Sequence, residues 1–271
     1  MLANLVRLWR HRTLIGSLVM RELKARYRGS FLGYFWSFLN PMMQLGVYTL
    51  VFTKYMPART ETVPTATYAL FLFCGILPWT WFASSLLEAS DVIIEHGNLI
   101  RKLLFPAEVL PLVRVLANMV HFLFGLPILL ATFLVYHALQ LAPPVTPYVM
   151  LFPVIVALQL LLTSGAALGL AALSVHFRDL KNILGNLLTM VFFASAILYP
   201  FDEALEKTGK WGFVLKWNPV AHLMVAYQHV LYFGYPLGLR PLAATATVSV
   251  GSFVAGYFIF DRLRDSFADE V

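Results

Sequence analysis

Residues 115–177 contain no lysine, arginine, aspartate or glutamate. A helix needs only about 20 apolar residues to cross the hydrocarbon core of a bilayer, so this stretch is too long for one transmembrane helix. A cluster of three prolines between residues 143 and 147 interrupts it, and prolines this close together cannot continue a helix. The stretch therefore predicts two membrane spans, at about residues 110–138 and 148–174.

The composition of the whole chain indicates that lipid is its solvent. Hydrophobic residues make up 59% of it and charged residues 13%, whereas a soluble domain usually has about 25% charged residues. A chain this apolar cannot cover its surface with polar groups. The net charge of +6 does not indicate a nucleic-acid partner, because seven of the 20 lysines and arginines precede residue 30 instead of spreading over a folded surface.

Four further stretches are uncharged, or nearly so, and have the length of a membrane span. They are residues 31–53, 66–88, 182–201 and 241–260. Asn40-Pro41 is expected to kink the first of them, whereas Pro78 in the second fits either the middle of a helix or a bend. The pattern predicts an all-α integral membrane protein, with residues 31–271 forming a single domain of six transmembrane helices.

The uncharged stretch Trp217–Leu239 is interpreted differently. Its continuous helical core, about Val220–Phe233, is too short to span a bilayer. Counting it as a span would also place Arg262 and Arg264 outside. We therefore expect re-entrant or interfacial helices on the extracytoplasmic side, within residues 202–239 between spans five and six. Such turns at membrane depth survive only when they are buried in protein or line a cavity.

The first 30 residues mix basic and apolar side chains. The apolar ones recur with a period near 3.6 on both sides of a break at Gly16. Residues 1–30 are therefore predicted to form an amphipathic helix, in one or two pieces, in the cytoplasmic interface; the alternative is a disordered basic tail. No cleavable signal peptide is expected, because the apolar run that follows exceeds the roughly 7–15 residues of a signal-peptide core.

The distribution of basic residues predicts the orientation. With six spans, fourteen of the 20 lysines and arginines lie on the same side as the N-terminal segment. Loops rich in lysine and arginine stay in the cytoplasm, so both termini are expected to be cytoplasmic.

The sequence lacks the motifs of an ATPase, a hydrolase or a metal site. Gly209-Lys210 resembles the end of a P-loop, but Ala204 stands where a glycine is required and Trp211 where serine or threonine is required. If the protein uses ATP, another subunit binds it. Cys74 is the single cysteine, which excludes an intrachain disulfide and favours a packing role. The histidines are scattered and show no metal-ligand spacing.

The spans contain almost no ionisable groups. Because charges inside a membrane are the usual mark of an ion or proton pathway, this argues against a proton-coupled transporter or an ion pump. A G-x-x-x-G pattern at Gly165 and Gly169 allows close helix approach, and we expect it to serve packing within the chain rather than dimerisation.

The loop between spans two and three is predicted to form a short amphipathic helix. Ile100, Leu103 and Leu104 would line one face, Arg101 and Lys102 would be exposed, and a proline at 106 ends the helix. A short helix of this kind on a loop is suited to docking in a groove of a soluble partner.

Aromatic side chains gather at the start of span one. One interpretation is the aromatic belt found at membrane interfaces. The other is a lumen lined by aromatic faces, on which sugar rings can stack and slide. Tyr199 and Phe201, at the outer end of span five, would serve the same purpose. The candidate channel-lining residues are Phe31, Tyr34, Phe35, Trp36, Phe38, Tyr199 and Phe201.

Five segments in order resemble the permease subunits of polysaccharide ABC exporters, which export O-antigen, capsule and teichoic-acid chains on lipid carriers. They are R-E-L-K-A-R-Y-R-G-S-F-L-G-Y-F-W-S-F-L-N-P (21–41), N-L-I-R-K-L-L-F-P (98–106), F-R-D-L (177–180), S-A-I-L-Y-P (195–200) and W-N-P-V-A-H-L (217–223). The similarity extends over nearly the whole chain.

The resemblance implies a homodimer of six-helix subunits in the bacterial cytoplasmic (inner) membrane, paired with two ATP-binding cassette subunits. ATP and Mg would be bound by those partners, with no cofactor and no enzymatic activity in this chain. The substrate would be a polysaccharide on a lipid carrier, which by the resemblance is expected to be a polyprenyl diphosphate. By the resemblance, the ATPase-coupling residues are Asn98, Leu99, Ile100, Arg101, Lys102, Leu103, Leu104 and Phe105, with Arg178 and Asp179 near the same surface.

Two alternatives stay open at this stage. The first is an ABC exporter of drugs or other lipids, which shares the architecture. The second is a membrane-embedded transferase, which would need polar catalytic residues near one interface, such as His222 or His229.

Overall fold

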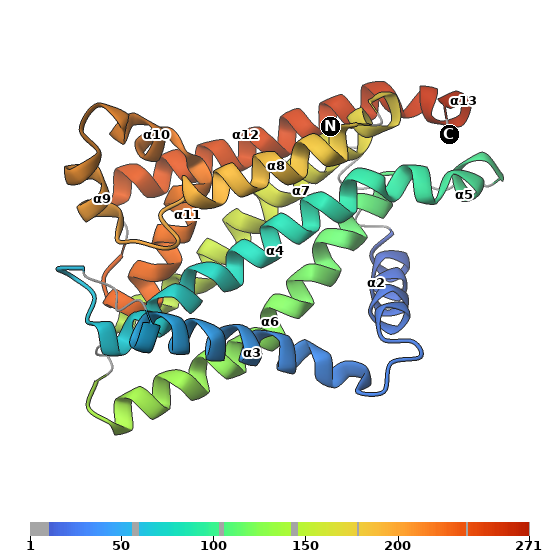
Figure 1. Ribbon diagram of the computed structural model, residues 1–271. Helices are drawn as coiled ribbons and strands as arrows, with labels where there is room; N and C mark the ends of the chain where they lie inside the picture. Colours follow the sequence, from blue (N-terminus) through green and yellow to red (C-terminus); the bar gives the residue numbers. More distant parts are fainter. Residues whose placement is uncertain are drawn as a thin grey trace.

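The computed structural model describes residues 11–55, 60–102, 106–141, 146–177, 179–236 and 238–270. These residues are mostly helical and include no strand (Figure 1). Four helices within the described ranges are long and apolar enough to cross a membrane. They are Thr65–Glu95, Val109–Ala138, Pro147–His176 and Leu239–Ser266. The all-α membrane class predicted from the sequence is confirmed.

These four helices carry the labels α4, α6, α7 and α12, with short 3₁₀ segments at some ends. The α-helical parts are Tyr68–Glu95 (α4), Val109–Ala138 (α6), Phe152–His176 (α7) and Leu239–Leu263 (α12). α6 and α7 agree closely with the predicted spans, because the prolines between them end one helix and start the next. α4 runs straight through Pro78 and continues to Glu95, seven residues beyond the predicted end.

The other two predicted spans are shorter in the structure. α3 covers Trp36–Leu50 and continues as a π-helix over Val51–Tyr55. α8 covers Leu180–Phe193 and so ends before the predicted residue 201. Its end is set from outside the helix: the Asn218 amide donates hydrogen bonds to the Ala194 carbonyl (2.9 Å) and the Ser195 hydroxyl (3.1 Å). The count of six spans stays a prediction.

Near the N-terminus, α2 runs over Arg12–Arg26 without interruption. Of the two forms expected for this segment, one helix or two pieces separated at Gly16, the structure has the helix continuous through Gly16; residues 1–10 lie outside the described residues. α2 lies across the direction of α3 and α4 (Figure 1), and its Val19 and Leu23 are buried in one cluster with residues of α6. A short 3₁₀ turn, η1 (Gly33–Phe35), leads from α2 to α3.

The core is built around α4. Its residues Leu70–Cys74 are almost completely buried, on every side of the helix, because α3, α6, α7, α8 and α11 all pack against it. The buried Cys74 confirms the packing role expected for the single cysteine. A helix that is apolar all round needs such complete cover.

Short helices connect α8 to α12 at the end of the molecule opposite α5 (Gly97–Lys102) and α13 (Phe267–Glu270) (Figure 1). They are α9 (Phe201–Thr208), η5 (Gly209–Trp211), α10 (Gly212–Trp217), α11 (Pro219–Gln228) and the π-helix η6 (His229–Phe233). α11 and η6 together match the short helical core expected from the sequence, and their side chains are largely buried.

Glu203 of α9 fastens this region to the segment before α4. Its Oε1 accepts hydrogen bonds from the backbone N–H groups of Glu61 (3.0 Å) and Thr62 (2.8 Å) and from the Thr62 hydroxyl (2.6 Å). Burial pushes the pKa of this carboxyl upward, but the hydrogen bonds from Thr62 and the nearby Lys207 outweigh it, so the pKa lies below its usual 4.5. The contact therefore weakens only as the pH falls through that lowered pKa.

α7 and α12 touch through glycines. A Cβ added at Gly256 would lie 1.8 Å from the Gly165 carbonyl oxygen, and one added at Gly165 would lie 2.3 Å from the Ser252 backbone. Only glycine allows this backbone-to-backbone approach. The G-x-x-x-G pattern thus packs within the chain, as the sequence predicted, although its second glycine, Gly169, is in ordinary contact at 3.6 Å.

We predict that Gly256→Ala destabilises the protein by roughly 1–3 kcal/mol, because the new methyl group forces α7 and α12 apart. The thermal midpoint of the purified protein in detergent measures the effect. Gly251→Ala is the matched control on the same helix, since no heavy atom lies within 4 Å of its added Cβ. Equal midpoints for the two variants would contradict the close packing.

Candidate functional site

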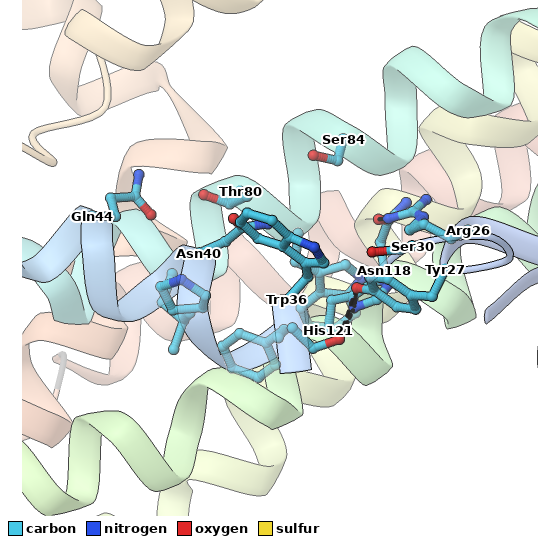
Figure 2. A pocket seen from close by; sticks show the side chains of 15 residues that line it. Arg26, Tyr27, Ser30, Trp36, Asn40, Gln44, Thr80, Ser84, Asn118 and His121 are labelled. Carbon is cyan, nitrogen blue, oxygen red and sulfur yellow. Dashed lines mark hydrogen bonds between the residues drawn. The ribbon is translucent and has the colours of Figure 1, made fainter. Parts of the chain in front are cut away.

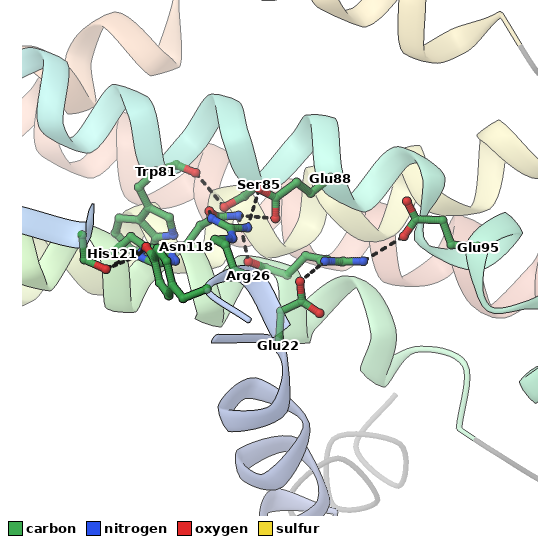
Figure 3. Close-up of polar contacts among 11 residues, drawn as sticks. Glu22, Arg26, Trp81, Ser85, Glu88, Glu95, Asn118 and His121 are labelled. Atoms are coloured by element: carbon green, nitrogen blue, oxygen red, sulfur yellow. Dashed lines mark hydrogen bonds and ion pairs between the residues drawn. The ribbon is translucent and has the colours of Figure 1, made fainter. Parts of the chain in front are cut away.

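Three carboxylates lie on one face of α4 at its α5 end. Glu88, Asp91 and Glu95 are separated by three and four residues, so they point in similar directions. Each is paired with a cation from a different helix, within the last two turns of α4. Figure 3 shows Glu88 and Glu95 with their partners. These turns lead directly into α5.

Arg114 of α6 holds two of the surrounding helices. Its Nη2 lies 2.8 Å from Glu95 Oε2 on α4, and its Nη1 pairs with Glu22 of α2. The Arg114 side chain is only 15% exposed, and a guanidinium can serve two carboxylates at once because its N–H groups point in fixed, separate directions. Arg114 therefore joins α2, α4 and α6.

Arg26, at the end of α2, makes a second junction. Its Nη2 lies 2.6 Å from Glu88 Oε1 and its Nη1 donates to Asn118 Oδ1 at 3.2 Å. Asn118 of α6 in turn donates to Glu88 Oε2 at 2.9 Å. The three side chains form a closed, charge-balanced ring between α2, α4 and α6.

The third junction involves α8. Lys181, near its start, forms an ion pair with Asp91. Each of the three carboxylates thus connects α4 to a neighbouring helix through an ion pair.

A cavity of about 470 Å³ begins beside Arg26 and runs between α3, α4 and α6 (Figure 2). Polar and aromatic side chains make up most of its lining. Its lining residues are Arg26, Tyr27, Ser30, Trp36, Ser37, Asn40, Pro41, Gln44, Leu77, Thr80, Trp81, Ser84, Asn118, His121 and Phe122.

Hydrogen bonds fix the wall of the cavity next to α2. The Tyr27 hydroxyl lies 2.7 Å from Ser37 Oγ and 3.3 Å from His121 Nδ1. Trp81 is fixed on another wall, because its indole N–H donates to the Val115 carbonyl at 3.1 Å and its ring stacks on Phe122, with ring centres 5.2 Å apart.

The predicted coupling segment is helical where it is described. α5 includes Asn98, which is exposed, and Ile100, which is partly buried against the cluster that contains Phe267 of α13. α13 contacts both α5 and α7, and Asp179 follows α7 closely, so Asp179 and α5 lie at the same end of the protein. The side chains of Leu99, Arg101 and Lys102, and residues Leu103, Leu104, Phe105 and Arg178, lie outside what the structure describes.

The structure does not bring the predicted channel aromatics together. Trp36 lines the cavity, and Phe38 packs against Phe124 of α6. Phe31, Tyr34 and Phe35 are exposed. Tyr199 donates a hydrogen bond to the Phe193 carbonyl, and Phe201 lies against His222, at the far end of the molecule.

The sequence analysis missed most of the cavity's polar residues. Asn40 and Gln44 are one helical turn apart on α3, and Thr80 and Ser84 are one turn apart on α4. Polar pairs with a spacing of four in otherwise apolar spans were the signal that would have identified them, because such pairs share a helix face.

A bundle of long apolar helices, joined by ion pairs at one end, is the architecture of a multi-pass integral membrane protein. The chain belongs to the ABC-2 type transporter family, which it matches over residues 13–232.

More particularly, the chain is similar to permeases of polysaccharide export systems. The O-antigen export system permease protein RfbA of Myxococcus xanthus is 40% identical over 264 residues, which cover 97% of each chain. The protein of the same name from Klebsiella pneumoniae is 29% identical, covering 92% of this chain and 91% of its own. The polysialic acid transport protein KpsM of Escherichia coli is 22% identical, covering 82% of each. The resemblance found in the sequence is confirmed.

We predict that Arg114→Met destabilises the protein by about 1.5–3 kcal/mol, the usual contribution of hydrogen bonds to charged groups. It should also release α2, which limited trypsin digestion at Lys24 and Arg28 would detect as faster cleavage. Arg114→Lys should restore only part of the stability, since lysine is a point charge without the guanidinium fork.

The matched control for this prediction is Arg264→Met. Arg264 pairs with Asp261 at 3.1 Å, but both side chains are more than one-third exposed, and such pairs contribute at most about 1 kcal/mol. Equal thermal midpoints and equal rates of trypsin cleavage for Arg114→Met and Arg264→Met would show that the junction of α2, α4 and α6 does not stabilise the protein.

Proposed function

We propose that this chain is the permease subunit of a bacterial ABC exporter for a lipid-linked polysaccharide of the O-antigen type. The observation that carries the proposal is the 40% identity, over nearly full length, to a protein named as an O-antigen export permease. The order of the five sequence segments supports it. The carrier is a polyprenyl diphosphate, and the chain itself carries no catalytic activity, as suits relatives named permeases and transport proteins.

The proposed topology has six spans within residues 31–271 and both termini in the cytoplasm. α3 with the π-helix Val51–Tyr55 that continues it, and α8, are the two spans added to the four long helices. α2 lies in the cytoplasmic interface, and the segment from α9 to η6 is re-entrant on the outer side. The clustering of lysine and arginine supports this orientation, and so does the position of α9 and α10 opposite α5 (Figure 1).

The working transporter is a homodimer with two ATP-binding cassette subunits, which bind ATP and Mg. Apolar side chains on α3 and α8 have no cover in the single chain. The exposed ones are Met42, Met43, Val47, Leu50, Ile183, Leu187, Met190 and Phe193. The two copies meet along these faces, with the remainder facing lipid, and enclose the channel between them.

α5 receives the motion of the ATPase. Residues 98–105, with Arg178 and Asp179 beside them, form the docking surface, and α5 follows α4 directly. Since α4 is ion-paired to α2, α6 and α8 in its last two turns, a displacement of α5 that moves the end of α4 also acts on these three helices.

We predict that Arg101→Glu combined with Lys102→Glu weakens association with the ATPase subunit at least tenfold, because reversed charges oppose docking. Co-purification from cells expressing both subunits measures the association, and polymer at the cell surface measures export. Lys210→Glu, at the opposite end of the protein, is the control and should leave both unchanged. Normal pairing and export in the double variant would refute the assignment of residues 98–105.

We further predict that thiol reagents distinguish the two ends of the protein. In a Cys74→Ala background, Asp179→Cys should resist a membrane-impermeant maleimide in intact spheroplasts and react after lysis. Lys210→Cys should react in both conditions, since the proposed topology puts it outside. Labelling of Asp179→Cys in intact spheroplasts would overturn the topology, and the export function with it.

A further inference from the structure

Uncharged polar side chains line the cavity deep along α4. Thr80 lies about 22 Å from Glu95 at 1.5 Å per residue, far from the ion pairs at the α5 end. Thr80 and Ser84 approach the cavity from α4, and Asn40 and Gln44 approach it from α3 (Figure 2). Amide and hydroxyl groups therefore converge on one space from two helices.

Much of the hydrogen-bonding capacity of these groups is unused. In the part of the chain that the structure describes, the Asn40 amide and the Ser84 hydroxyl have no hydrogen-bond partner. Gln44 has one weak donor contact, from Nε2 to the Tyr48 hydroxyl at 3.3 Å. Thr80 donates to the Ile76 carbonyl at 2.9 Å and keeps its acceptor sites. Asn40 and Thr80 are exposed in the single chain, so a ligand can reach these groups and supply the hydrogen bonds that the protein does not.

Aromatic rings supply the other half of the lining. Trp36 from α3 and the stacked pair Trp81 and Phe122 form apolar walls beside the polar groups. A pyranose ring has C–H faces that pack on aromatic rings and hydroxyls around its edge that bond to amides and hydroxyls. A volume of about 470 Å³ falls in the range of small-molecule sites, roughly 300–1,000 Å³.

The charge of the cavity favours a neutral ligand. Arg26 is the one charged residue among the described residues that line it, and Glu88 with Asn118 already bind its guanidinium. A phosphate would have to approach beside the Glu88 carboxylate, which repels it. The lining thus suits a sugar better than the diphosphate of a carrier lipid.

A second space of about 380 Å³ lies next to the cavity, between α3, α4 and α8, and Tyr48 and Thr189 are among its lining residues. Gln44, Thr80 and Ser84 line both spaces. The same three polar side chains are therefore available to a ligand on either side of them.

We infer that this cavity in each copy of the chain binds one uncharged sugar unit of the transported polymer. Trp36 packs on a face of the sugar, and Asn40, Gln44, Thr80 and Ser84 bond its hydroxyls. The inference rests on the proposed export function and adds to it a saccharide site inside each copy, beside α3.

The test uses the full-length chain with its ATPase partner in lipid nanodiscs. The probe is the glycan freed from its carrier by mild acid, taken from the cells that make it, and tryptophan fluorescence follows binding. Thr80→Val should lower the affinity about two- to tenfold, for one lost hydrogen bond, and Asn40→Leu with Gln44→Leu should lower it further. Thr132→Val is the matched control: its hydroxyl bonds the Ile128 carbonyl in the same way, at 2.8 Å, outside the cavity.

A second readout does not depend on fluorescence. In a Cys74→Ala background, the released glycan should slow alkylation of Ser84→Cys by a water-soluble reagent, whereas inorganic pyrophosphate should not. Thr132→Cys should react at the same rate with and without the glycan. Melting temperatures of all variants verify that they fold.

Several results would overturn the saccharide site. They are wild-type affinity in both Thr80→Val and the double variant, protection of Ser84→Cys by pyrophosphate alone, or no binding of the glycan. The response of the partner's ATPase activity to the intact lipid-linked polymer separates the two proposals. Stimulation without glycan binding would refute this site and leave the export function standing, whereas no response to either ligand would refute both.

Discussion

The architecture depends on how three carboxylates are neutralised at the edge of an apolar helix bundle. Charges near a low-dielectric region are unfavourable unless they are paired. Glu88, Asp91 and Glu95 therefore need cations within reach, and α4 cannot supply them from its own surface. Arg26, Arg114 and Lys181 come from three different helices. The three carboxylates of α4 are thus neutralised only when α2, α6 and α8 pack next to it.

The same pairing shapes the cavity. With Arg26 held by Glu88, the next residue, Tyr27, reaches Ser37 and His121. These bonds fix the start of α3 against α6 and leave Asn40 and Gln44 facing Thr80 and Ser84 across an open space. The charged side chains thus form ion pairs between the helices. Most side chains that line the cavity are uncharged.

The sequence predicted those features that depend on local signals, and it did not predict those that depend on contacts between residues far apart in the chain. Hydrophobic length and proline placement are local signals, so α6 and α7 were located closely. The end of α8 depends on Asn218, 24 residues after the carbonyl it caps, and no local pattern contains that information. The ion pairs join residues as far apart as Glu22 and Arg114. Of the aromatic residues named as candidate channel lining, Trp36 lines the cavity, and the channel-lining role of the set stays a prediction.

The glycine contact between α7 and α12 has a mechanical consequence. With the backbones touching at Gly165 and Gly256, neither helix can roll or slide on the other without a collision, so the two act as a single strut. Shape changes during a transport cycle must then occur elsewhere, in the helices around α4 that are held by side chains. The cavity lined by Asn40, Gln44, Thr80 and Ser84 lies among these helices that are held by side chains.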